Sequence, residues 1–193
     1  MERSAFEPSP RERRALRLNL LLNLAGNVSV QGLALGKDSS EQNLFVVQGS
    51  QRGCNSLRLP EVFSATIPVR VRVIPLDGWL VKQKIDHVDF IKLDVEGGEL
   101  DALIGGARLF ERRPRPTVLA EVQDIRTRPW GYPAIEIINY LADRGYRWFR
   151  TLGGGSVEPL DLSSVDFDGN FIACPEESLG TLELMGLNPR AVR

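Results

Sequence analysis

The chain has 193 residues, of which 42% are hydrophobic and 25% are charged, and its formal net charge is −1. These values are typical of a globular protein with one sizeable core, and they favour a single domain. The near-neutral charge gives no reason to expect nucleic acid or an anionic membrane as a partner, and no apolar run reaches the length of a membrane span.

The two cysteines and the amino terminus indicate the same compartment. Cys54 and Cys174 form neither a disulfide framework nor a metal-ligand spacing. The first four residues lack the features of a signal peptide. We therefore expect a cytoplasmic protein whose two cysteines are reduced and structural.

The chain opens with the end of a strand at 5–7, and a helix follows. Ser9 suits the N-cap, Pro10 suits the first helical position, and Glu12 completes a capping box. Leucines at helical spacing predict an apolar stripe, which consists of Leu16, Leu20, Leu21 and Leu24. Gly26 marks the expected end of the helix.

Strands predominate in the next part of the chain. They are predicted at 28–35 and 44–47, and the polar residues 48–56 form a loop. Valines alternate with arginines from 69 to 73, which predicts a strand with one wet face in an antiparallel insertion. A short helix is predicted at 76–81.

The second half of the chain alternates strands with helices. Strands are predicted at 88–94, 117–122, 146–151 and 170–174, and helices at 99–112 and 133–144. The pair Gly105-Gly106 is unfavourable inside a helix, so we expect close packing there. Residues 153–155 are three glycines and predict a loop.

This order of elements predicts an α/β fold with a mostly parallel, doubly wound sheet. The last two strands have no helix between them, so we expect a hairpin that adds an antiparallel edge strand. We assign residues 1–180 to one domain and residues 181–193 to a polar tail.

Three carboxylates, Asp94, Glu96 and Glu99, crowd the point where a buried strand passes into a helix. Ligands of open α/β sheets bind outside the carboxyl ends of the strands. These acids could hold an ammonium group, act as general base toward a hydroxyl, or bind a divalent cation. The simpler alternative is that they complement the helix dipole. We assign Glu99 to that role and Asp94 to function.

Two further acids stand at strand ends. Glu7 follows the first strand, where an acidic residue of nucleotide-binding folds accepts hydrogen bonds from ribose hydroxyls; it could also merely flank the helix. Glu121 lies in an apolar strand, which is unfavourable unless the carboxylate is paired or faces the cleft. Trp130 follows that strand, in a loop that we expect over the cleft.

The segment 89–99 closely resembles the signature of the FkbM family of S-adenosylmethionine-dependent methyltransferases, D-x-I-K-x-D-V-E-G-x-E. Residues 6–8, Phe-Glu-Pro, and residues 76–77, Leu-Asp, match further pieces of the family pattern. The resemblance implies a Rossmann-like class I methyltransferase fold, S-adenosylmethionine as cofactor, and a small hydroxyl-bearing acceptor such as a sugar or secondary metabolite.

The resemblance also implies roles for individual residues. Glu7 and Pro8 would contact the cofactor ribose, and Ala34 and Leu35 would lie beside its adenine. Asp94 would meet the cofactor and, with Glu96 and Glu121, form the catalytic side. No residue is assigned to a metal, and the oligomeric state is not indicated.

One departure from the family pattern is the missing first strand, together with the glycine-rich D-x-G-A-N-x-G loop that follows it. We therefore expect a fold that is incomplete at its amino terminus, with the missing strand belonging between the second and fourth strands of the family sheet. The alternatives are a catalytically inactive relative acting as a scaffold or interaction module, and a nicotinamide-dependent oxidoreductase.

Overall fold

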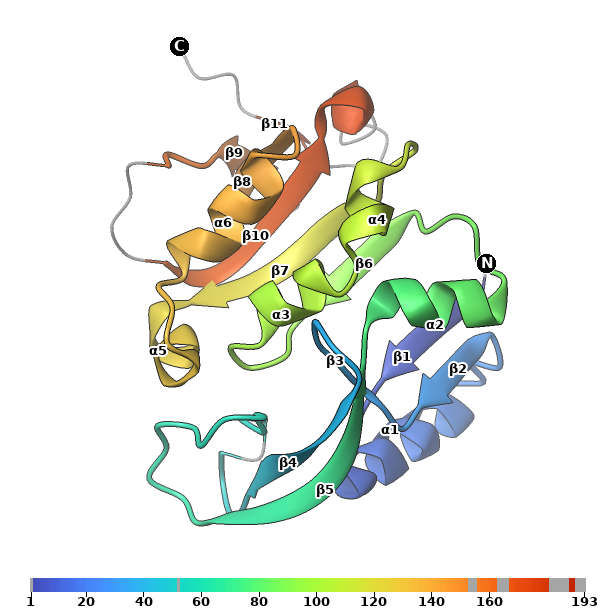
Figure 1. Cartoon of the computed structure of the whole chain (residues 1–193), viewed down its shortest axis with the longest axis vertical. Coiled ribbons are helices and arrows are strands. Elements are labelled where there is room, and N and C mark those ends of the chain that lie inside the picture. The colour runs from blue at the N-terminus through green and yellow to red at the C-terminus, as the bar shows by residue number, and fades with distance from the viewer. Residues whose placement is uncertain (1, 52, 153–155, 163–166, 181–187, 190–193) are drawn as a thin grey trace.

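The strands of the computed structural model lie in three separate sheets (Figure 1). The structure describes residues 2–51, 53–152, 156–162, 167–180 and 188–189. The predicted glycine loop at 153–155 and most of the predicted tail lie outside these residues. None of the helices described is both long and apolar enough to cross a lipid bilayer.

The largest sheet has six strands, in the order β11-β9-β8-β10-β7-β6. In chain order they are β6 (Phe90–Leu93), β7 (Thr117–Gln123), β8 (Tyr146–Leu152), β9 (Ser156–Pro159), β10 (Asp168–Pro175) and β11 (Asn188–Pro189). Strands β6 and β7 are parallel, whereas β10 runs antiparallel to both β7 and β8.

The two smaller sheets come from the first half of the chain. Strands β1 (Arg3–Phe6) and β2 (Val28–Gln31) form a parallel pair. Strands β3 (Ala34–Leu35), β4 (Ser40–Val47) and β5 (Thr66–Ile74) form a sheet in which β4 and β5 are antiparallel. The antiparallel insertion predicted from the Val–Arg alternation is therefore confirmed.

The helices are α1 (Pro10–Leu22), α2 (Leu76–Gln83), α3 (Glu99–Ile104), α4 (Ala107–Glu111), α5 (Asp124–Thr127) and α6 (Ile135–Ala142). Short 3-10 helices cover Arg128–Trp130 and Glu176–Ser178. The buried face of α6, formed by Ile137, Ile138 and Leu141, packs into the core of the large sheet with Val118 and Ala120 of β7. These alternating residues of β7 point to the helix-covered face because side chains alternate along a strand.

Helix α2 connects the two halves of the molecule. Its Leu76, Trp79 and Leu80 form a buried cluster. Phe6 of β1 and Ile91 of β6 both pack against this cluster, and the Phe6 and Trp79 rings meet edge to face at 4.8 Å. The small amino-terminal sheet is thus attached to the large sheet through one helix.

The prediction of a mixed α/β fold is confirmed, but two details of the sheet were wrong. The strands do not form one mostly parallel sheet, because β1 and β2 share no ladder with β6 in the described structure. The antiparallel strand β10 is not at an edge either, since it pairs on both sides. Strand β9 then extends the sheet beyond β8, and its four residues are too few for a clear sequence pattern.

The predicted helix at 99–112 is divided into α3 and α4 at the glycine pair. A Cβ atom on Gly105 would lie 2.2 Å from the carbonyl oxygen of Gly36, so the close packing predicted there is confirmed. The predicted strand at 28–35 is also divided, because its first half pairs with β1 and its second half with β5.

The amino-terminal helix begins where predicted, but its apolar stripe is not buried. Leu21 and Leu24 are 70% and 91% exposed, because the two-stranded sheet beside α1 is too small to cover a helix face. The predicted capping box is also absent. The Ser9 amide donates to Glu7 Oε1 at 2.8 Å, and the Ser9 hydroxyl donates to the Glu12 carboxylate.

Candidate functional site

The turn after β6 holds its acids in a fixed arrangement. Glu99 is 2% exposed, and its carboxylate accepts hydrogen bonds from the backbone amides of Val95 at 3.0 Å and Gly97 at 3.3 Å. Glu96 adopts φ +56°, a left-handed conformation that is uncommon for a residue with a side chain. The buried Glu99 therefore organises the turn, and this turn carries Glu96.

Two glycines let another segment of the chain approach the turn closely. A Cβ atom on Gly97 would lie 2.1 Å from the carbonyl oxygen of Arg126, and one on Gly98 would lie 2.8 Å from the ring of Trp130. The φ of Gly97 is +97°, which side chains also disfavour. Backbone packing therefore explains why Gly97 and Gly98 stand after Glu96.

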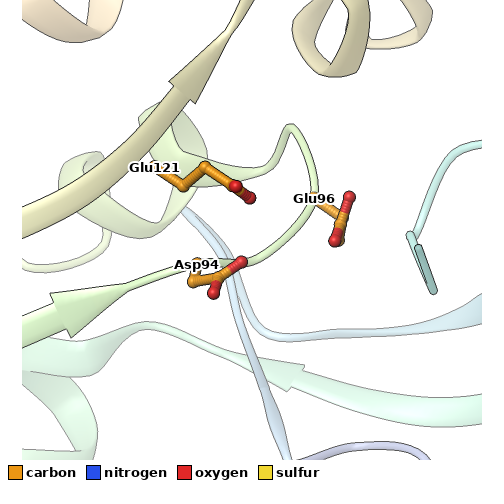
Figure 2. Close-up of side chains that lie close together, drawn as sticks. All are labelled: Asp94, Glu96 and Glu121. Carbon is orange, nitrogen blue, oxygen red and sulfur yellow. The ribbon is translucent and has the colours of Figure 1, made fainter. Parts of the chain in front are cut away.

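Three carboxylates converge at the carboxyl ends of β6 and β7. Leu93 is in register with Ala120, so the next residues, Asp94 and Glu121, are neighbours across the two parallel strands. Asp94, Glu96 and Glu121 each offer one oxygen that lies within 4.8 Å of the other two. Figure 2 shows the three side chains close together. The sequence predicted that these residues act together, and the structure brings them together.

Burial and mutual repulsion alter the acidity of this cluster. Burial raises the pKa of Glu96 to about 7, while the nearby Arg126 guanidinium opposes the shift. Burial also raises the pKa of Glu121, and the adjacent Asp94 raises it further. Lys92 Nζ lies 2.7 Å from Asp94 Oδ2 and supplies a positive charge at the exposed side. At neutral pH the cluster can therefore hold a proton, which a set of ordinary surface acids would not.

The connection between β4 and β5 covers one side of the cluster. The Ser56 hydroxyl donates to the carbonyl oxygen of Glu96 at 2.7 Å. Trp130 Nε1 donates to Ser56 Oγ at 3.2 Å, and the Arg58 guanidinium stacks 4.6 Å from the centre of the Trp130 ring. Trp130 was expected near the cleft, but nothing in the sequence pattern indicated Ser56 or Arg58.

Arg126 is another residue that the sequence analysis missed. Its Nε lies 3.0 Å from Glu96 Oε2, and its Nη2 lies 3.2 Å from the Sγ of Cys54. Arg126 is far from both partners in sequence, so no local signal could have joined them. Glu96 Oε2 is buried and accepts no well-aligned hydrogen bond from the described residues, although it is ion-paired.

A cavity of about 10 Å³, enough for roughly one water molecule, adjoins Glu96 and Arg126. Its other lining residues are Ser56, Pro60, Glu61, Ile125 and Pro129. A larger cavity of about 440 Å³ lies between α2 and α4, and none of the three clustered carboxylates lines it. We assign the chemistry to the acidic cluster, because it gathers carboxylates whose pKa values burial raises, and such groups mark functional sites.

Four of the five residues predicted to hold a cofactor lie in or directly after the first strands of the chain, whereas the fifth, Asp94, belongs to the acidic cluster. Glu7 and Pro8 follow β1, and Ala34 and Leu35 form β3. Ala34 is buried, and Leu35 packs beside the β6 residue Ile91 in the α2 cluster. No hydrogen bond or ion pair among the described residues joins these four to the three carboxylates.

One oxygen of the Glu7 carboxylate is available to a ligand. Its Oε1 accepts the Ser9 amide, whereas its Oε2 accepts no hydrogen bond from the described residues. Burial raises the pKa of Glu7, and the Ser9 hydrogen bond opposes the shift. A half-buried carboxylate with a free oxygen can accept hydroxyl hydrogen bonds from a ligand.

As a chemical unit, the cluster of Asp94, Glu96 and Glu121 can accept hydrogen bonds from an ammonium group or a hydroxyl, take up a proton, or surround a cation.

Comparisons with known proteins agree on one family. The model of the methyltransferase FkbM domain matches residues 4–148, which is most of the chain. The crystal structure of methyltransferase FkbM from Methylobacillus flagellatus KT is similar, with a TM-score of 0.51 and 20% sequence identity. That similarity covers 90% of this chain and 36% of the other, so the chain spans about a third of its length. No curated protein sequence is significantly similar.

Proposed function

The chain belongs to the FkbM methyltransferase family, and from this membership we propose that it is an S-adenosylmethionine-dependent O-methyltransferase. The proposed acceptor is a hydroxyl group of a small molecule such as a sugar or a secondary metabolite. The observation that carries the proposal is the meeting of Asp94, Glu96 and Glu121 where β6 and β7 end. The proposed fold type is Rossmann-like class I, in which ligands bind at this edge of the sheet.

Glu96 is the best candidate for the general base. Its pKa of about 7 lies near physiological pH, where a base is both substantially ionised and able to hold a proton. Its Oε2 has no aligned hydrogen-bond donor in the described structure. An acceptor hydroxyl that reaches the Glu96 carboxylate would donate its proton there, while Asp94 and Glu121 keep the surroundings negative.

The cofactor would be held by residues whose chemistry suits its parts. The free oxygen of Glu7 suits a ribose hydroxyl, and the Ala34-Leu35 strand suits a flat apolar base. Asp94 suits the ammonium group of the methionine moiety. When bound, S-adenosylmethionine supplies an activated methyl group, and the chain supplies alignment, a proton acceptor and a site shielded from water.

The first test is binding of S-adenosylmethionine, measured by isothermal titration calorimetry on the wild-type chain and Glu7→Gln. Loss of a charged acceptor from a ribose contact should weaken binding by roughly 10- to 100-fold. The matched control is Glu41→Gln, because Glu41 is an exposed acid that pairs with Arg70 on the surface. Methyl transfer from labelled cofactor to a panel of hydroxyl acceptors then tests the reaction.

The outcomes separate the three functions weighed from the sequence. Micromolar binding that depends on Glu7 supports the methyltransferase. Absence of binding at millimolar cofactor would favour a scaffold without catalysis, and binding of a nicotinamide dinucleotide instead would favour an oxidoreductase.

A further inference from the structure

Arg126 joins three segments that are remote in sequence. Its guanidinium contacts Glu96 in the turn after β6 and Cys54 in the β4–β5 connection, at 3.0 and 3.2 Å. The same Nε donates to Gln123 Oε1, at the end of β7, at 3.2 Å. The side chain is 24% exposed, so these contacts are partly shielded from solvent.

The backbone that carries Arg126 is fixed independently of these contacts. Asp124 begins α5, and its two carboxylate oxygens accept the amides of Ala134 at 3.0 Å and Phe167 at 3.2 Å. The carbonyl oxygen of Arg126 lies so close to Gly97 that no Cβ would fit there. The guanidinium therefore extends from a rigid base, and it cannot leave Glu96 by a shift of the helix alone.

We propose that Arg126 is a positioning residue, which holds the Glu96 carboxylate beside Asp94 and Glu121 and is itself held by Cys54. The proposal rests on the proposed function, in which Glu96 accepts the proton of the acceptor hydroxyl. Arg126 does not take part in proton transfer, because its guanidinium keeps its charge at every relevant pH. Arg126 fixes the position of the Glu96 carboxylate and lowers the pH at which this carboxylate ionises.

The balance of charge around Glu96 makes this role measurable. The charged and titratable groups near Glu96 come from its own turn, from β6 and β7, from α5 and from the β4–β5 connection, and they are Lys92, Asp94, Glu99, Glu121, Arg126, Glu61 and Cys54. Arg126 is the cation that pairs directly with Glu96, whereas Lys92 pairs with Asp94 at the exposed side. Removal of Arg126 would take away this pairing charge while the neighbouring acids remain, and the neutral form of Glu96 would be favoured further.

The test compares Arg126→Gln and Arg126→Lys with the wild-type protein. The pKa of Glu96 is measured by NMR titration of ¹³C-labelled glutamate carboxyl groups, with Glu96→Gln used to assign the signal. Arg126→Gln should raise this pKa by about one unit or more, and the acid limb of kcat/KM should move by the same amount. Arg126→Lys keeps the charge but loses the planar fork, so it should show a smaller shift.

Arg70→Gln is the matched control, because Arg70 forms an exposed pair with Glu41 at 3.3 Å on the β4–β5 sheet, and neither residue lines the cavity beside Glu96. It should leave the pKa of Glu96 unchanged. Cys54→Ala, which removes only the second anchor, should shift the pKa in the same direction as Arg126→Gln and by less. If Arg126→Gln does not fold, the Cys54→Ala variant alone tests whether Arg126 positions Glu96.

An unchanged pKa of Glu96 in the Arg126 and Cys54 variants would overturn the proposal, as would an equal shift in Arg70→Gln. The NMR titration needs no activity. A wild-type chain that neither binds cofactor nor transfers methyl groups would contradict the proposed function. The titration would still show whether Arg126 sets the pKa of Glu96.

Discussion

Glu96, a single residue of the acidic cluster, makes the stability of the fold depend on pH. Its pKa is about 7 in the folded protein against an ordinary value of 4.5. Between these values the unfolded chain has already released a proton that the folded protein still binds. The folded state therefore loses stability as the pH rises through this window. Glu99 and Glu121, whose pKa values burial also raises, act in the same direction.

Glu96→Gln should separate the stability of the fold from the reactivity of the site. Glutamine keeps the neutral form at every pH, so the variant should melt a few degrees above wild type at about pH 8 and close to wild type at about pH 4. Methyl transfer should fall at least about 100-fold, the usual contribution of a general base. Calorimetry across pH checks the first expectation. Glu158→Gln is the control, because Glu158 forms an exposed pair with Arg150. Equal melting temperatures of Glu96→Gln and wild type at high pH would contradict the expected stabilisation.

Among the helices, glycines decide where an element breaks and how closely segments approach. Gly105 separates α3 from α4 and lies against the carbonyl of Gly36, so a side chain would force the two segments apart. Gly78 lies inside α2, and a Cβ atom added there would have nothing within 4 Å. Gly105 is needed for packing, whereas Gly78 only weakens helix α2.

The two alanine substitutions should therefore have opposite signs. Gly78→Ala should raise the free energy of unfolding by about 0.5–1 kcal/mol, because alanine restricts the unfolded chain and favours the helix. Gly105→Ala should lower it by roughly 1–3 kcal/mol through overpacking. Urea denaturation of both variants measures the difference, and a stable Gly105→Ala would show that α3 and α4 do not need the close contact.

Across the whole molecule, an ion pair between the buried Arg115 and the more exposed Glu177 joins the segment after β10 to the middle of the chain. Arg115 is 8% exposed; its Nε donates to Glu177 Oε1 at 2.9 Å, and it also donates to the carbonyl of Arg144. These contacts link the start of β7, the turn before β8 and the 3-10 helix after β10. The Arg115 guanidinium lowers the pKa of Glu177 to about 2.

Arg115→Gln should lower the free energy of unfolding by about 1.5–3 kcal/mol, because it removes a charge-assisted hydrogen-bonded pair, while Arg113 stays 3.9 Å from Glu177. Arg147→Gln is the control, because Arg147 pairs with the neighbouring Glu176 at 3.6 Å on the exposed surface. The stabilisation from Glu177 is present above its ordinary pKa of 4.5 and is lost as the pH falls toward 2. The difference between the two variants should therefore shrink in acid, as thermal melts at several pH values would show.

Local sequence was enough to predict most helices and strands and the acids of the site. Hydrophobic runs, glycines and turn residues act over a few positions, so α2, β6, β7 and the close packing at Gly105 were predictable. Asp94, Glu96 and Glu121 were identified as a group, because residues at the carboxyl ends of neighbouring parallel strands meet at one edge.

The division of the strands into sheets and the surroundings of the acids arise instead from contacts between distant segments. Strand order depends on hydrogen bonds across such segments, so β1 and β2 could be separated from β6, and β10 could enter the interior of the large sheet. Leu18, Leu21 and Leu22 of α1 stay exposed for a related reason, since burial needs a partner surface that a helix cannot specify alone. Ser56 and Trp130 reach the backbone of Glu96 from 40 and 34 residues away, and no local pattern records contacts that only packing of the folded chain creates.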